Sequence, residues 1–82
     1  MDDLHCEIIT PLQVVYDAPV GLVQVPGEKG LFTVLKNHAP IISVLTEGSI
    51  RVIGKNGHEK HFDCKSGVVE CKNNKMVILI HE

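Results

Sequence analysis

The sequence predicts an all-β domain, and three observations support that fold class. Valine, isoleucine and threonine make up 22 of the 82 residues, whereas alanine, the best helix former, occurs only twice. β-Branched side chains suit a pleated, half-buried surface better than a helix. Glycine or proline interrupts nearly every window long enough for a helix, and short apolar runs alternate with turn residues. Many short strands with regular turns are typical of a sandwich or a barrel.

Each predicted strand is a short apolar run bounded by turn residues. In the first run, residues 4–8 alternate between apolar and polar, which in a strand places the two sets on opposite faces. The strongest tight-turn signals are Lys55-Asn56-Gly57 and Lys72-Asn73-Asn74-Lys75. We expect strands at about residues 4–9, 13–17, 20–25, 31–35, 41–45, 49–53, 58–64, 68–71 and 76–81.

Two of these runs are apolar at consecutive positions, so both of their faces are apolar. They are Ile41-Ile42 and residues 76–80, Met-Val-Ile-Leu-Ile. The first interpretation is that both runs form central strands covered on both sides. The second is that one face packs into the core and the other meets a partner, because an exposed apolar patch on a small domain marks an interface.

Length, charge and cysteine content exclude several classes of protein. Eighty-two residues fit a single domain, residues 1–82. The net charge of −2 provides no basic face for nucleic acid. No apolar run approaches the roughly 18 residues of a membrane span, and the acidic start, Met1-Asp2-Asp3-Leu4, does not resemble a signal peptide. We therefore expect a protein of the cytosolic compartment with three reduced thiols, at Cys6, Cys64 and Cys71.

Candidate chemical sites are few. His58, His61 and Cys64 have the spacing of three that would align them on a helix, but on a strand His61 faces away from the other two. We therefore expect no metal site, no cofactor and no catalytic residue. Lys75, at a predicted turn, supports the main alternative, which is a small β carrier module that displays a biotinylated or lipoylated lysine. Its neighbours do not match the motifs of such carriers.

The segment from Pro26 to Pro40, PGEKGLFTVLKNHAP, carries the most information. It contains a Pro-Gly-x-x-Gly turn, an apolar strand that ends in Val-Leu, and then His-Ala-Pro. This order resembles the epsilon subunit of the F-type ATP synthase. Further segments resemble other strands of that family in the same order, so the likeness covers nearly the whole chain: LHCEIITP at 4–11, VVY at 14–16, EGSIRV at 47–52, SGVVEC at 66–71 and MVIL at 76–79.

The sequence departs from the family pattern at a few positions. Leu31 occupies a place that is often acidic, Lys36-Asn37 replaces Pro-Gly before the histidine, and Val68 replaces a glycine. The sequence ends at Glu82, before the family's C-terminal helical hairpin. The resemblance therefore implies a short form that consists of the N-terminal domain alone, a flattened antiparallel β-sandwich of two sheets.

The resemblance also implies a mechanical role. Epsilon subunits belong to the rotor, where they link the gamma subunit to the c-ring and couple proton flow to ATP synthesis. This implies a non-catalytic, peripheral subunit on the cytoplasmic face of a bacterial-type plasma membrane. The residues carried over to the c-ring side are Glu28, Lys29, Gly30, Leu31 and Phe32. Those carried over to the gamma side are Thr10, His38, Ala39, Pro40, Ile42 and Ser43. A stand-alone binding module of similar β architecture remains the second hypothesis.

Overall fold

The computed structural model describes residues 3–81, and within them the regular structure is all strand. The domain measures 33 × 23 × 19 Å along its principal axes. No helix in the described residues is long and apolar enough to cross a membrane. The strands are β1 (Leu4–Ile9), β2 (Val14–Gly27), β3 (Gly30–Val34), β4 (Ile41–Leu45), β5 (Gly48–Gly54), β6 (Glu59–Cys64), β7 (Ser66–Lys72) and β8 (Lys75–His81).

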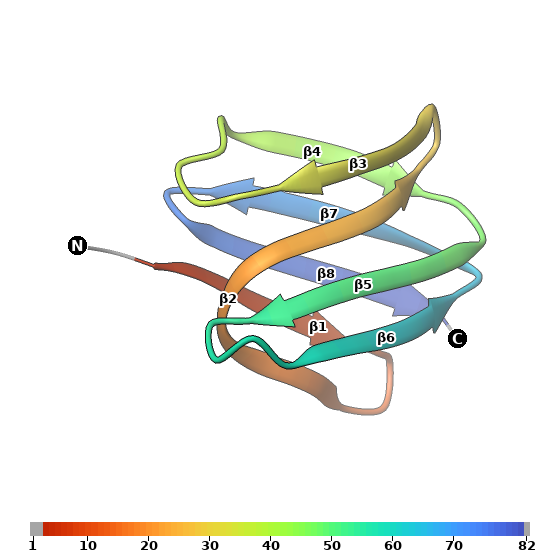
Figure 1. Ribbon diagram of the computed structural model, residues 1–82. Coiled ribbons are helices and arrows are strands. Elements are labelled where there is room, and N and C mark those ends of the chain that lie inside the picture. Colours follow the sequence, from red (N-terminus) through yellow and green to blue (C-terminus); the bar gives the residue numbers. More distant parts are fainter. Residues whose placement is uncertain (1–2, 82) are drawn as a thin grey trace.

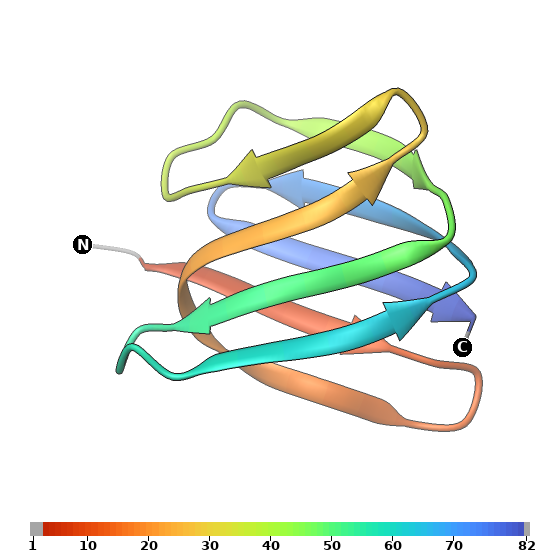
Figure 2. The same ribbon diagram turned by 45° about the vertical axis from the view of Figure 1, so that its right-hand side comes forward.

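The strands form two layers joined by β2, as Figures 1 and 2 show. One layer, here called the back sheet, contains β4, β7, β8, β1 and the first half of β2. The other, the front sheet, contains β3, the second half of β2, β5 and β6. The pairing register of β2 with β5 shifts between Val20 and Leu22, where the strand passes from one layer to the other. The two layers therefore belong to one continuous sheet, folded into a sandwich as predicted.

Two details differ from the sequence-based prediction. The first is that β1 and β8 pair in parallel, whereas the other pairs are antiparallel. The second is that residues 13–17 and 20–25 form one long strand despite Pro19. Proline breaks a ladder only where its missing N–H would be needed. Here the Pro19 carbonyl accepts a hydrogen bond from Lys55 N on the β5 side, so the lost donor is on the side away from β1.

The core lies between the inner faces of the two sheets. In β1 the buried residues are Leu4, Cys6 and Ile8, which confirms the predicted alternation. The back sheet adds Val69, Cys71, Met76, Ile78 and Ile80, and the front sheet adds Val23, Val25, Val34, Ile50 and Val52. The three cysteines are free and buried, as predicted. Burial raises the pKa of the Cys6 thiol to about 12.

Candidate partner-binding surface

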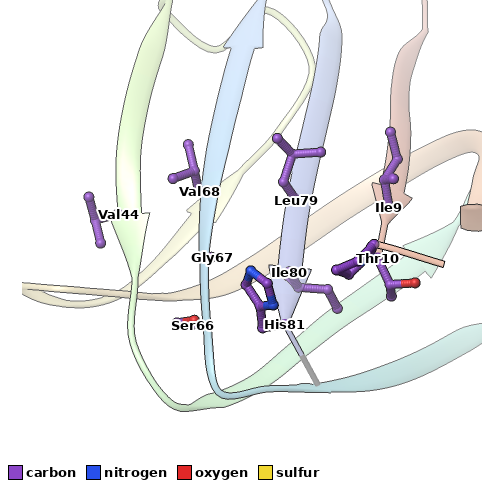
Figure 3. Close-up of a pocket in the computed structure, with 10 residues that line it drawn as sticks. Ile9, Thr10, Val44, Ser66, Gly67, Val68, Leu79, Ile80 and His81 are labelled. Carbon is purple, nitrogen blue, oxygen red and sulfur yellow. The ribbon is translucent and has the colours of Figure 1, made fainter. Parts of the chain in front are cut away.

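The outer face of the back sheet carries a row of exposed apolar side chains. Val44 pairs with Val68, Val68 with Leu79, and Leu79 with Ile9, so the four lie side by side across β4, β7, β8 and β1. Figure 3 shows them in line. Val44 is 51% exposed, Val68 40% and Leu79 50%, and Ile9 is half-buried. Cross-strand neighbours on one face are close enough to form a single surface, here called the apolar row.

A groove of about 470 Å³ runs beside the apolar row. Thr10, Gly67 and His81 complete its wall at one end of the sheet, as Figure 3 shows. Gly67 keeps two strands in close contact, because a Cβ at this position would lie 2.5 Å from the backbone oxygen of Leu79. The groove is therefore mainly apolar, with a hydroxyl and an imidazole at one end.

A second row follows on the same face, one step along the strands. Ile42 pairs with Glu70, Glu70 with Val77, and Val77 with Glu7. Ile42 is 73% exposed. We considered that Ile41-Ile42 and residues 76–80 are covered on both sides. This interpretation is wrong for the described chain. A single sandwich has only two layers, so each sheet has one face that no other part of the domain covers.

The gamma-side residues expected from the resemblance do not form one patch. Thr10 is buried, and its hydroxyl oxygen accepts hydrogen bonds from the amides of Leu12 and Gln13 at 3.2 Å. Ile42 points outward, whereas Ser43 is half-buried on the opposite face of β4. The strand registers place the His38-Ala39-Pro40 segment at the end of the back sheet opposite Thr10.

The ring-side residues lie in the β2–β3 turn and at the start of β3. Glu28 and Lys29 are exposed between Gly27 and Gly30, and Gly30 has a φ of 126° that favours glycine. The turn is tied to β4, because the Glu28 amide donates to the Val44 carbonyl at 3.1 Å. Leu31 is 66% exposed. Phe32 is on the opposite face of β3 and packs against the core, so its side chain is half-buried.

The other candidate sites stay apart. His61 is exposed on β6 and contacts Glu59, whereas Cys64 points into the core. Among residues 3–81, no three His, Cys, Asp or Glu side chains are grouped to hold a metal ion. Lys75 begins β8 directly after a two-residue turn and is exposed.

Sequence reasoning missed the members of the apolar row as site residues. Only Leu79 lies in one of the two runs that are apolar on both faces, so the sequence carried a signal for that member alone. The pattern alone could not tell whether the second face meets another layer of the same chain or remains open. The strand order decides this, because it brings β4, β7, β8 and β1 together as one uncovered face.

Comparison with protein families gives one match over nearly the whole chain. The model described as "ATP synthase, Delta/Epsilon chain, beta-sandwich domain" matches residues 3–82. Among similar proteins, the ATP synthase epsilon chain of Chlorobaculum tepidum is 34% identical over 76 residues, which are 93% of this chain and 86% of that one. The epsilon chain of Campylobacter curvus is 40% identical over 79 residues, which are 96% of this chain but only 61% of that protein.

Solved structures share the fold at low sequence identity. A chain in the mitochondrial ATP synthase of Euglena gracilis superposes with a TM-score of 0.91 at 16% identity, over 98% of this chain and 51% of that one. A chain in the central stalk and c-ring structure of the Tetrahymena thermophila enzyme gives a TM-score of 0.80 at 15% identity, over 99% of this chain and 65% of that one. These likenesses establish the β-sandwich.

Proposed function

Because this chain belongs to the delta/epsilon chain family of ATP synthase, we propose that it acts in the central stalk of the F1 sector. There it would link the gamma subunit to the c-ring and pass on rotation without catalysing a reaction itself. The complex would hold it at the cytoplasmic face of a bacterial-type membrane. A close-packed interior supports such a mechanical role, since dense cores deform little under load.

The proposal that this chain binds the gamma subunit rests on a single observation, which is the apolar row. Four apolar side chains lie side by side on an open sheet face, with Ile42 in the next row. A contiguous exposed apolar patch on a small domain is characteristic of a protein interface. Glu70 and Glu7 flank the patch, so a gamma surface that fits would be apolar at its centre and basic at that margin. A specific interface here should bury at least about 1,000 Å² in total.

The exposed β2–β3 turn supports the proposal for the c-ring. Its tip is polar, and its base is held by the hydrogen bond between Glu28 and Val44. The same bond joins it to the strand that carries Val44 and Ile42. The turn and the apolar row would therefore move as one body when the ring turns.

Co-purification of this chain with a co-expressed gamma subunit tests the proposal. Leu79→Asp places a charge in the centre of the apolar row and should abolish co-purification. Thr33→Asp is the control, because Thr33 is exposed on β3 of the front sheet and lies outside both the apolar row and the loop of residues 35–40. Both variants should keep the β-sheet circular dichroism of the parent. Normal co-purification of a folded Leu79→Asp variant would remove the apolar row from the interface.

The alternative, a stand-alone binding or carrier module, is not favoured by the family match. A carrier would bear a covalent group on Lys75, which adds a fixed increment to the intact mass. We expect the mass of the unmodified chain. An increment on Lys75 would contradict the stalk proposal.

A further inference from the structure

Two asparagines that are far apart in the sequence are joined by two hydrogen bonds, and both involve the side chain of Asn74. The backbone amide of Asn37 donates to Asn74 Oδ1 at 2.6 Å, and Asn74 Nδ2 donates to Asn37 Oδ1 at 3.1 Å. We call this pair of hydrogen bonds the amide clamp. It joins the loop between β3 and β4 to the turn between β7 and β8.

Both asparagines occupy backbone positions where glycine is the usual residue. Asn37 has a φ of 65°, in a turn closed by the bond from the His38 amide to the Leu35 carbonyl. Asn73 and Asn74 have φ values of 52° and 60°, as a two-residue hairpin of type I′ requires. A glycine at position 74 would satisfy its turn but remove both bonds, and a glycine at position 37 would keep only the bond donated by its backbone amide. Asparagine tolerates the left-handed region and also provides a side-chain amide.

The clamp holds a loop that connects two strands in different sheets. Residues 35–40 connect the end of β3 in the front sheet to the start of β4 in the back sheet. Asn74 is itself anchored, because its backbone carbonyl accepts a hydrogen bond from the His5 amide at 2.9 Å. Through Asn74, Asn37 is therefore attached to the strands β1 and β8. Asn37 is the residue that directly precedes His38.

We propose that Asn37 and Asn74 are positioning residues. They hold the His38–Pro40 segment in a fixed position relative to the outer face of the back sheet. The clamp orders this segment before a partner arrives, so less ordering entropy is lost on binding. The part of this inference that concerns partner binding rests on the proposed contact with gamma, on whose side the family resemblance places His38, Ala39 and Pro40. The part that concerns loop order is a property of the isolated chain.

Amide hydrogen exchange on the isolated chain tests the loop order. Asn74→Gly retains the turn geometry and removes both bonds of the clamp. Loss of such hydrogen bonds should speed exchange at Asn37 by about five- to tenfold. Asn73→Gly is the matched control, because it makes the same change in the same turn, one residue outside the clamp. It should leave exchange at Asn37 unchanged.

Two further variants separate the clamp from a general loss of stability. Asn74→Asp keeps an acceptor for the Asn37 amide but loses the Nδ2 donor, so its exchange rate should be intermediate. In the double variant Asn37→Gly and Asn74→Gly, exchange at His38 should be no faster than in Asn74→Gly, because that single change already removes both bonds of the clamp. Equal exchange in Asn74→Gly and Asn73→Gly, or additive effects in the double variant, would overturn the clamp.

Affinity for a purified gamma subunit tests the positioning role. Asn74→Gly should weaken binding by about three- to tenfold, within the cost of ordering a few side chains, while Asn73→Gly binds as the parent does. If the parent binds gamma and Asn74→Gly binds equally well despite faster exchange, the positioning role is wrong. If the parent itself does not bind gamma, the proposed function fails, and the exchange comparison still decides whether the clamp orders the loop.

Discussion

The outer faces of the two sheets differ in chemistry, although both inner faces are apolar. On the front sheet, Arg51 of β5 and His61 of β6 both contact Glu59 of β6, at 3.1 and 2.7 Å. On the back sheet, Val44, Val68 and Leu79 lie side by side. Exposed ion pairs contribute little to stability. On the front face these charged side chains make the outer surface polar and hydrated. This contrast between β5–β6 and the apolar row is why we propose the back face for contact with another protein, although Leu31 on β3 is also exposed.

The largest expected effect concerns two neighbours on β8 that lie on opposite faces. Ile78 is fully buried, whereas Leu79 is 50% exposed. Ile78→Asp would bury an unpaired carboxylate, and the cost of several kcal/mol is comparable to the whole stability of a small domain. We expect this variant to be unfolded by circular dichroism and Leu79→Asp to be folded. If both variants behave alike, the assignment of the two faces is wrong.

Thiol reactivity tests the interior that both faces share. Burial raises the pKa of all three cysteine thiols, and that of Cys6 to about 12. Reaction with a thiol reagent needs the thiolate and access, so in the folded chain it should be slower than in denaturant by roughly a thousandfold or more. The check is absorbance after addition of Ellman's reagent, with and without guanidinium. Rapid reaction of one thiol in the folded chain would show that the sandwich is open at that site.

Ile42→Asp tests how far the partner surface extends along β4. Ile42 is 73% exposed on the same face as the apolar row, so the domain should still fold. Binding to gamma should weaken by about 2 kcal/mol or more, roughly thirtyfold, if Ile42 contributes as a central contact. Isothermal titration with gamma measures this loss. Parental affinity in a folded variant would confine the interface to the apolar row.

A smaller effect is expected at the β2–β3 turn. Leu31 is 66% exposed, so Leu31→Asp should change the free energy of unfolding by less than about 1 kcal/mol. Glu28→Ala should reduce coupling of proton flow to ATP synthesis only modestly, because exposed ion pairs are worth about 0–1 kcal/mol. Urea unfolding and proton pumping in membrane vesicles check the two variants. Unfolding of Leu31→Asp would assign Leu31 to the core.

The smallest effect concerns the polar front face and pH. Hydrogen bonds from Arg51 and then His61 lower the pKa of the Glu59 carboxyl from its usual value. A carboxyl whose pKa is lower in the folded state than in the unfolded state stabilises the fold at pH values above its unfolded-state pKa. This stabilisation is lost as the pH falls through its folded-state pKa. The unfolding midpoint of Glu59→Gln should therefore lie slightly below that of the parent near neutral pH, and the two should converge in acid. A gap between the midpoints that widens in acid would contradict this assignment.

The sequence alone determined the fold class, most strand positions and part of the core. Alternation in residues 4–8 identified the buried Leu4, Cys6 and Ile8, because a strand turns successive side chains to opposite faces. The two turns rich in lysine and asparagine were also evident, because few residues accept positive φ. The family was recognisable from the order of its motifs, and residues 3–82 match it.

Only the tertiary structure decided which apolar faces remain open and which distant residues meet. The two-sided apolar runs fit either a covered or an exposed second face, and the choice depended on how β4, β7, β8 and β1 associate. Asn74 lies in a turn that the sequence predicts, but nothing in the sequence indicates its contact with Asn37. Local sequence determines backbone conformation and the direction of each side chain. Long-range pairing determines what that side chain touches, because it depends on the folding of the whole chain.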